Sequence, residues 1–311
     1  MLKSGSCFLF PFGILPDSFF FISFVITIND IKPMKKLLTI MAIVLTTGVQ
    51  AQEEVLDTAQ FVAVYNYQCT TQNDAGEPVV DAMDIVVQVG RTMTKSMPWS
   101  QSSLKPMSIE AEGKAYQEAY LHIPTIWMGW PEGQTTSREL IFPYNFEGKE
   151  TTPEIQWTLG DDTLRIGDYL CQHATATFRG LTWQVYYTEE IPSSAGPWRL
   201  RGLPGLIVKA ESGAHSFVLT QVLQQSEPIT YKPDPEARQL SYKKLLKYRL
   251  DTYGNKQYAK NPNYYLPEFS ELIKSFPSSQ MTILKQFDAV FLDWRPMLQK
   301  GHVYQPLELK Y

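Results

Sequence analysis

The sequence predicts a mainly β protein, built as a curved antiparallel sheet or an open barrel with helical additions toward its carboxyl terminus. Alternating apolar and polar residues recur in short segments between residues 61 and 222, whereas helical spacing begins only after Pro233. Strands therefore gather early and helices late, without the regular alternation that a doubly wound α/β fold requires. The 311 residues are 44% hydrophobic and 19% charged, which is typical of a chain that buries a core.

Two strands joined by a turn are predicted near the start of this region. In Phe61–Cys69 alternate residues share one face, with Asn66 and Gln68 on the other, and Met83–Val89 repeats that alternation. The shared face of the first segment consists of Phe61, Ala63, Tyr65, Tyr67 and Cys69. Residues 73–76 between them, Asn-Asp-Ala-Gly, are typical turn formers. Residues 97–136 have no sustained period and predict at most a short helix near Tyr116–Tyr120.

Strand character returns in the middle of the chain. Tyr169–Phe178 and Leu181–Thr188 are long alternating segments, and Arg179-Gly180 between them predicts a hairpin. Further strands, which bring the expected total to about seven or eight, are Glu139–Phe146, Ile155–Leu159, and Leu206–Lys209 with Ser216–Val222 as a second hairpin.

Helical spacing marks the last part of the chain. One apolar stripe predicts a helix and consists of Tyr242, Leu245, Leu246, Leu250 and Tyr253. The basic residues of the same segment, Lys243, Lys244, Lys247 and Arg249, are interpreted as a solvated face, with contact to an anionic surface as the alternative. Glu268–Phe276 predicts another short helix, and Met281–Phe291 fits either a helix or a strand.

A secretory signal is predicted to begin at Met34. From there the chain reads MKKLLTIMAIVLTTGVQAQ, with two lysines, a short apolar run and small residues before a cleavage site. We expect residues 34–51 to be removed and residues 52–311 to form a single exported domain. Residues 1–33 are interpreted as a spurious upstream extension, with a membrane hairpin as the alternative. No later apolar segment is long enough to span a membrane, so the product is predicted not to be membrane-spanning.

Two cysteines remain after Gln52, namely Cys69 and Cys171. Because an exported protein enters an oxidising compartment, this even pair predicts a disulfide. The alternative is two buried free thiols, since a bridge requires close Cα atoms that the sequence does not reveal.

The sequence carries no catalytic signature. G-x-S-x-G, G-x-G-x-x-G, Walker A, H-E-x-x-H and C-x-x-C motifs are absent. His173 and Cys171 would share a strand face, but two ligands are too few for a metal site. The adjacent acids Asp161-Asp162 and Glu189-Glu190 are interpreted as turn and strand-end residues. We therefore predict no catalytic residue, no cofactor and no metal.

The segment before Leu206 contains two Pro-Gly features. Leu203 to Leu206 predicts a type II turn in which Gly205 has a positive φ. Upstream, Trp198 is interpreted as a buried anchor for a loop. These residues resemble the GLPGLI family in two elements: Gly196-Pro197-Trp198, and the hexapeptide Gly202, Leu203, Pro204, Gly205, Leu206 and Ile207.

The resemblance implies an exported protein, periplasmic or outer-membrane associated, of a Gram-negative, Bacteroidetes-type bacterium. Such proteins are rich in β structure and have no established activity, so the resemblance supplies no catalytic residue. The motif itself has no titratable side chain and cannot act as an acid, base or nucleophile.

Three functions remain open. The first is a cell-envelope binding or assembly module, whose partner would be an envelope protein or an apolar or peptide ligand. The second is a hydrolase using carboxylates such as Asp161 or Glu190, which requires these acids to meet in one pocket. The third is a purely structural envelope protein. A nucleic-acid partner is not expected, because 28 basic residues stand against 32 acidic ones and the net charge is -4.

Overall fold

The computed structural model describes five parts of the chain. These parts are residues 52–72, 75–102, 123–141, 144–253 and 305–311. Five predicted segments lie outside them: Tyr116–Tyr120, Glu268–Phe276, Met281–Phe291, the signal peptide and the upstream extension.

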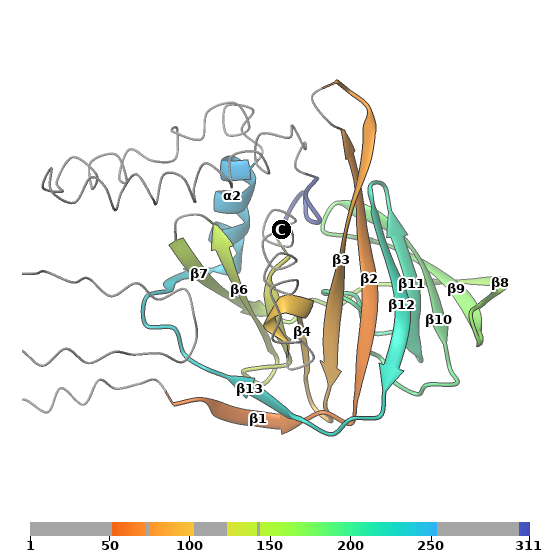
Figure 1. The fold of residues 1–311 in the computed structure, drawn as a ribbon, viewed down its shortest axis with the longest axis horizontal. Helices are drawn as coiled ribbons and strands as arrows, with labels where there is room; N and C mark the ends of the chain where they lie inside the picture. The colour runs from red at the N-terminus through yellow and green to blue at the C-terminus, as the bar shows by residue number, and fades with distance from the viewer. Residues whose placement is uncertain (1–51, 73–74, 103–122, 142–143, 254–304) are drawn as a thin grey trace, which may run out of the picture. The chain divides into compact units, whose positions relative to one another are not determined.

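Fourteen strands form two sheets in the described residues. The large sheet has twelve strands in the order β14-β7-β6-β5-β4-β3-β2-β12-β11-β10-β9-β8 (Figure 1). Its neighbours run antiparallel, except for β14 and β7, which are parallel. The small sheet pairs β1 (Glu54–Thr58) with β13 (Pro228–Tyr231). The prediction of a mainly β fold is confirmed.

The strands of the large sheet have these bounds: β2 Phe61–Gln72, β3 Pro78–Val89, β4 Thr94–Pro98, β5 Thr125–Met128, β6 Gln134–Ile141, β7 Tyr144–Thr151, β8 Thr158–Ile166, β9 Tyr169–Phe178, β10 Leu181–Thr188, β11 Leu206–Ser212, β12 His215–Leu223 and β14 Arg238–Ser241. A 3-10 turn covers Trp99–Gln101, and the helix α2 covers Tyr242–Tyr253.

Strands β2 and β3 contribute many residues to the largest hydrophobic cluster of the described residues, which is called the main core below. They pair without interruption from Phe61 opposite Val89 to Gln72 opposite Pro78. Because alternate side chains of a strand share a face, Tyr65 and Tyr67 point the same way, and both are buried in the main core. The predicted strand pair is therefore confirmed, and both strands are longer than expected.

The two predicted hairpins are also present. Strands β9 and β10 are joined at Arg179 and Gly180, whose φ angles of 55° and 86° give the mirror-image turn that suits the twist of a hairpin. Strands β11 and β12 pair from Lys209 opposite Val218 to Ser212 opposite His215.

The large sheet curls, so that strands far apart in its order approach each other. Arg179, in the turn between β9 and β10, forms a salt bridge with Glu150 on β7. Strands β7 and β9 lie near opposite ends of the sheet. No hydrogen-bonded pairing joins the end strands β14 and β8 in the described part of the chain, so the sheet is an open one, as predicted.

The helix α2 packs on β6, β7 and β14 with its predicted stripe inward. Tyr242, Leu245 and Leu246 form a separate core with Phe146 of β7. Arg249, which was expected on a solvated face, is instead only 2% exposed. Its position on the helix places it beside the stripe, where it meets buried carboxylates.

Several elements differ from the prediction. The short strands β1, β4, β5, β13 and β14 were not expected, because four or five residues are too few to establish an alternation. Asp161-Asp162, expected in a turn, lies inside β8, where the pairing with β9 shifts register between Leu159 and Thr163. A register shift of this kind interrupts the pairing and bends the strand locally.

Candidate functional site

The loop between β10 and β11 carries the Gly-Pro-Trp triplet and is tightly packed. Trp198 has a positive φ of 54° and is fully buried, with its ring 5.7 Å from Trp183 and 5.9 Å from Phe178 between centroids. The N–H of Gly202 donates to the carbonyl of Ser194 at 2.9 Å, which closes the loop. The prediction that Trp198 anchors a loop is confirmed.

The predicted type II turn at Leu203 to Leu206 is wrong. The N–H of Leu206 donates to the carbonyl of Ile191 at 3.1 Å, and Gly205 is not among the glycines with positive φ. Glycine is required at 205 for space, because a Cβ there would lie 2.1 Å from the carbonyl oxygen of Thr188. Sequence reasoning identified the special residue but assigned it the wrong reason.

Three of the remaining motif residues are buried in the main core. Leu203, Leu206 and Ile207 are at most 2% exposed, while Pro204 lies on the surface. The carbonyl of Ile207 accepts a hydrogen bond of 2.7 Å from the buried Tyr65 hydroxyl. The motif therefore begins β11 and fastens it to the sheet.

The predicted disulfide between Cys69 and Cys171 is absent, and both cysteines are free and buried. Cys69 lies on β2 and Cys171 on β9, with β12, β11 and β10 between them in the sheet. The two cysteines also point to different faces of the sheet. Cys69 belongs to the main core, whereas Cys171 lies three residues before the core residue Ala174 on β9 and therefore points to the opposite face. Burial raises the pKa of each thiol to about 11, which keeps both protonated at neutral pH.

His215 is buried at the start of β12 and is held from two sides. Its Nε2 lies 3.2 Å from the carbonyl oxygen of Pro306, and its Nδ1 lies 2.9 Å from the hydroxyl of Tyr67. A carbonyl only accepts, so Nε2 carries the proton and the hydroxyl of Tyr67 donates to Nδ1. Burial lowers the pKa of His215 to about 4, which makes the neutral ring the folded form at pH 7.

The free energy of unfolding is expected to decrease as the pH is lowered, because of His215. Its pKa is about 4 in the folded chain against 6.5 for the free side chain, so the contribution is complete above pH 6.5 and is lost as the pH falls toward 4. The loss is on the order of 1 kcal/mol per pH unit over that window. Urea unfolding at several pH values measures it, and His215→Gln, which keeps a donor and an acceptor, is the control. Equal slopes for both proteins would contradict the assignment.

Six charged side chains form a buried ion cluster where the curled sheet, α2 and the carboxyl-terminal tail meet. Its members are Arg179, Arg199, Arg249, Glu139, Glu150 and Glu308. None is more than 9% exposed. Three arginines face three glutamates, so the formal charges cancel within the cluster.

Glu308 lies at the centre of the ion cluster. Its carboxylate is 2.8 Å from Nη1 of Arg249, 3.1 Å from Nε of Arg199 and 3.6 Å from Nε of Arg179, and it accepts a hydrogen bond from the hydroxyl of Tyr242. Burial raises its pKa, but Arg199, Arg249, the hydroxyl of Tyr242 and Arg179 outweigh burial and leave the pKa lowered. Glu308 is therefore ionised.

The outer members of the ion cluster are also paired. Arg249 makes two hydrogen bonds to the carboxylate of Glu139, at 2.7 and 2.8 Å, and Arg199 reaches Glu150 at 2.8 Å. Burial raises the pKa of Glu139 more than Arg249 lowers it. Every member has an opposite charge beside it, so the cluster joins distant elements of the fold.

Sequence reasoning did not find the ion cluster. Its members come from β6, β7, the β9–β10 turn, the loop before β11, α2 and the tail. The first local signal is Arg249, which lies one helical turn from the apolar Leu245 and Leu246. Arg199 carried a second signal, because it lies between Trp198 and Leu200, which are both buried. In an extended chain Arg199 would point away from these two residues, but this loop is not extended and all three side chains are buried.

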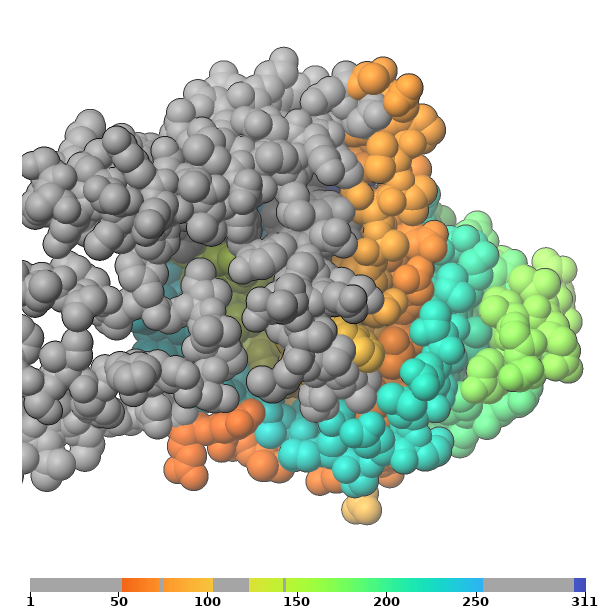
Figure 2. Space-filling model, viewed as in Figure 1, coloured from red at the N-terminus to blue at the C-terminus, as the bar shows by residue number. Residues whose placement is uncertain are grey.

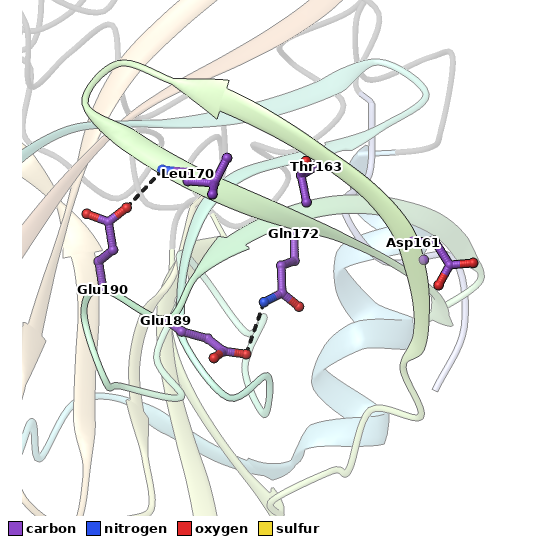
Figure 3. A pocket seen from close by; sticks show the side chains of 7 residues that line it. Asp161, Thr163, Leu170, Gln172, Glu189 and Glu190 are labelled. Carbon is purple, nitrogen blue, oxygen red and sulfur yellow. Dashed lines mark hydrogen bonds between the residues drawn. The ribbon is translucent and has the colours of Figure 1, made fainter.

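A pocket of about 460 Å³ opens at the β8 end of the sheet. It is lined by Gly160, Asp161, Thr163, Leu170, Gln172, Glu189 and Glu190 (Figure 3). The fold thus brings Asp161 close to the acidic pair Glu189-Glu190, which is far from it in the sequence. It does so because β8 and the end of β10 lie on either side of β9.

The three carboxylates of the pocket do not meet at one point. Glu190 accepts a hydrogen bond of 3.0 Å from the N–H of Leu170, and Glu189 accepts one of 3.2 Å from the amide of Gln172. Asp161 lies at the opposite side, and its carboxylate points away from the other two (Figure 3). The pocket therefore presents spread negative charge rather than a pair of acids aimed at one bond.

The described residues show neither a metal site nor a membrane-spanning helix. They contain no group of three or more histidine, cysteine, aspartate or glutamate side chains placed to hold a metal ion. His173, which shares a strand face with Cys171, binds Gln184 at 2.8 Å. Within the same residues no helix combines the length and the apolar character needed to cross a membrane.

Comparison with known proteins gives little. No protein-family model matches the chain, and no curated protein matches it significantly. Two structures of PNGF-II, solved in space groups C2 and P21, are similar with a TM-score of 0.37 and with 12% and 13% identity. Each match covers 60% of this chain and 32% of the PNGF-II chain, so this chain matches about a third of that protein. Likeness at this level assigns no function.

Proposed function

We propose that the chain is an exported binding module of the GLPGLI kind, which captures a cationic ligand at the acidic pocket. The observation that carries the proposal is the gathering of Asp161, Glu189 and Glu190 around one solvent-open pocket. Their sequence positions alone did not predict this. A positively charged group seated there would be attracted by the negative charge spread around the pocket.

Capture fits the geometry better than hydrolysis. A hydrolase of the carboxylate type needs an acid and a base or nucleophile at a fixed separation across one bond. Glu189 and Glu190 are instead engaged by an amide and a backbone N–H, and Asp161 points elsewhere. The hydrolase remains the second candidate because the three acids do share a pocket, and turnover lost in Glu189→Gln would favour it.

The affinity for a cationic ligand depends on how far the carboxylates of the pocket are exposed to water. Two unit charges 4 Å apart attract by about 1 kcal/mol in water, and salt at 0.15 M screens charges beyond about 8 Å. Asp161, Glu189 and Glu190 are all exposed. Each ion pair therefore contributes little, and binding of a small cation should be weak and sensitive to salt.

The double variant Asp161→Asn/Asp162→Asn is expected to weaken the binding of trilysine amide about tenfold at low salt. It removes one carboxylate that lines the pocket, Asp161, and its neighbour Asp162, while keeping side-chain shape, and added salt should erase the difference from the original protein. Calorimetric titration measures both. Glu53→Gln/Glu54→Gln, at an exposed acidic pair on and beside β1, is the control with the same change of net charge. Equal loss in the two double variants would mean that net charge, not the pocket, holds the ligand.

Export rests on the signal pattern from Met34 and on the family resemblance. Amino-terminal sequencing of the native protein tests this, and a chain that keeps residues 34–51 would contradict it.

A further inference from the structure

Strand β8 forms an open edge of the large sheet. It has nine residues and pairs with β9 alone among the described strands. All of its residues except Ile166 are exposed. Figure 2 shows the yellow-green residues of this region on the surface. The opposite edge, β14, has only four residues and is followed directly by α2, which packs against it.

The backbone of β8 near its turn has hydrogen-bonding groups that point outward. Gly167 and Asp168 form a two-residue turn, so the flanking pair Ile166 and Tyr169 exchanges hydrogen bonds and the next pair, Arg165 and Leu170, does not. The contact of Leu170 agrees, because its N–H donates to Glu190 at 3.0 Å, away from β8. The N–H and C=O of Arg165 therefore face solvent.

The side chains of this edge combine apolar contact with negative charge. Leu159, Leu164 and Leu170 are 58%, 45% and 51% exposed, so apolar surface is available on both faces. Around them lie five exposed carboxylates and one cation: Asp161, Asp162, Asp168, Glu189, Glu190 and Arg165. An added strand would bring its backbone to β8 and its alternate side chains over the pocket.

We propose that β8 is extended by a strand from another protein, in which apolar residues alternate with lysine or arginine. This inference rests on the proposed function, and it identifies the cationic ligand as an extended strand of a protein. Backbone hydrogen bonds to β8 give affinity, and the carboxylates select a cationic strand. A second copy of this chain is a poorer occupant, because it would bring the same excess of carboxylates to the edge.

The probe is an eight-residue peptide of alternating lysine and valine, blocked at both ends and fluorescently labelled. Arg165→Pro removes the outward N–H without touching the bonds to β9, while Arg165→Ala makes the same change of charge and keeps the N–H. We expect the peptide to bind Arg165→Pro at least tenfold more weakly than Arg165→Ala in an anisotropy titration. The same peptide with methylated backbone nitrogens should fail to bind the unaltered protein, which tests the inference without any risk of misfolding.

The outcomes separate the inference from the proposed function. Equal binding to both Arg165 variants and to the methylated peptide, with loss in Asp161→Asn/Asp162→Asn, would overturn strand addition and leave cation capture in place. Binding that depends on neither the backbone nor the acids would overturn both. A dimer in sedimentation that disappears in Arg165→Pro would assign the edge to a second copy and overturn the inference.

Discussion

Glu308→Ala is expected to destabilise the chain by about 3 to 5 kcal/mol, because it leaves three buried arginines facing two glutamates. Glu308 is fully buried and touches all three arginines, so no other carboxylate can replace it and water cannot reach the uncompensated charge easily. Urea unfolding followed by tryptophan fluorescence measures the loss. Trp198, next to Arg199 in the chain, provides a signal from the adjoining core.

Two variants show whether charge or packing carries this effect. Glu308→Gln keeps the volume and removes only the charge, so it should cost nearly as much as Glu308→Ala if the ion cluster depends on electrostatic balance. Glu211→Ala removes a carboxylate that pairs with Lys209 at 2.9 Å but is 45% exposed, and it should cost less than about 1 kcal/mol. A similar small loss in all three variants would contradict the central place given to Glu308.

The tail is therefore part of the fold. Pro306 accepts from His215, Leu307 enters the main core, Glu308 completes the ion cluster, and the N–H of Leu309 donates to the carbonyl of Arg179 at 2.8 Å. These contacts fasten the carboxyl terminus to the β9–β10 turn and to β12. They explain how an open, curled sheet stays together without hydrogen bonds between its end strands.

Local patterns predicted the elements that local forces specify. The hairpin β9–β10 and the stripe of α2 follow from alternation and helical spacing, which any reader can count along the chain. The ion cluster could not be predicted in the same way, because an arginine that is buried by distant carboxylates looks like an exposed one in the sequence. Arg249 shows this plainly, since its neighbours Lys243, Lys244 and Lys247 are exposed, as expected.

The candidate site was predictable in part. Both acidic pairs were noticed, but strand order decides whether they meet, and strand order depends on which distant strands pair. The prediction of a disulfide was wrong for the same reason. Only the strand order shows how far apart Cys69 and Cys171 lie, with β12, β11 and β10 between β2 and β9. Residue chemistry was visible in the sequence, whereas proximity was not.

Gly205→Ala is expected to cost about 3 kcal/mol or more, since overpacking against backbone is poorly relieved. The new Cβ would lie 2.1 Å from the carbonyl oxygen of Thr188, 2.5 Å from its carbonyl carbon and 2.8 Å from the nitrogen of Glu189. These atoms end β10, and Thr188 is paired with Leu206 of β11, so neither strand can retreat without breaking the ladder. Thermal unfolding measures the loss.

Asparagine distinguishes a need for space from a need for an unusual backbone angle. At a glycine with positive φ, asparagine is tolerated better than alanine, because its side chain accepts the left-handed region. Gly213, with a φ of 55° and open space around it, should follow that rule and lose about 1 kcal/mol or less as Gly213→Asn. At Gly205 the obstacle is the backbone of Thr188, so Gly205→Asn should be as damaging as Gly205→Ala. A mild Gly205→Asn beside a severe Gly205→Ala would restore the type II turn that the sequence suggested.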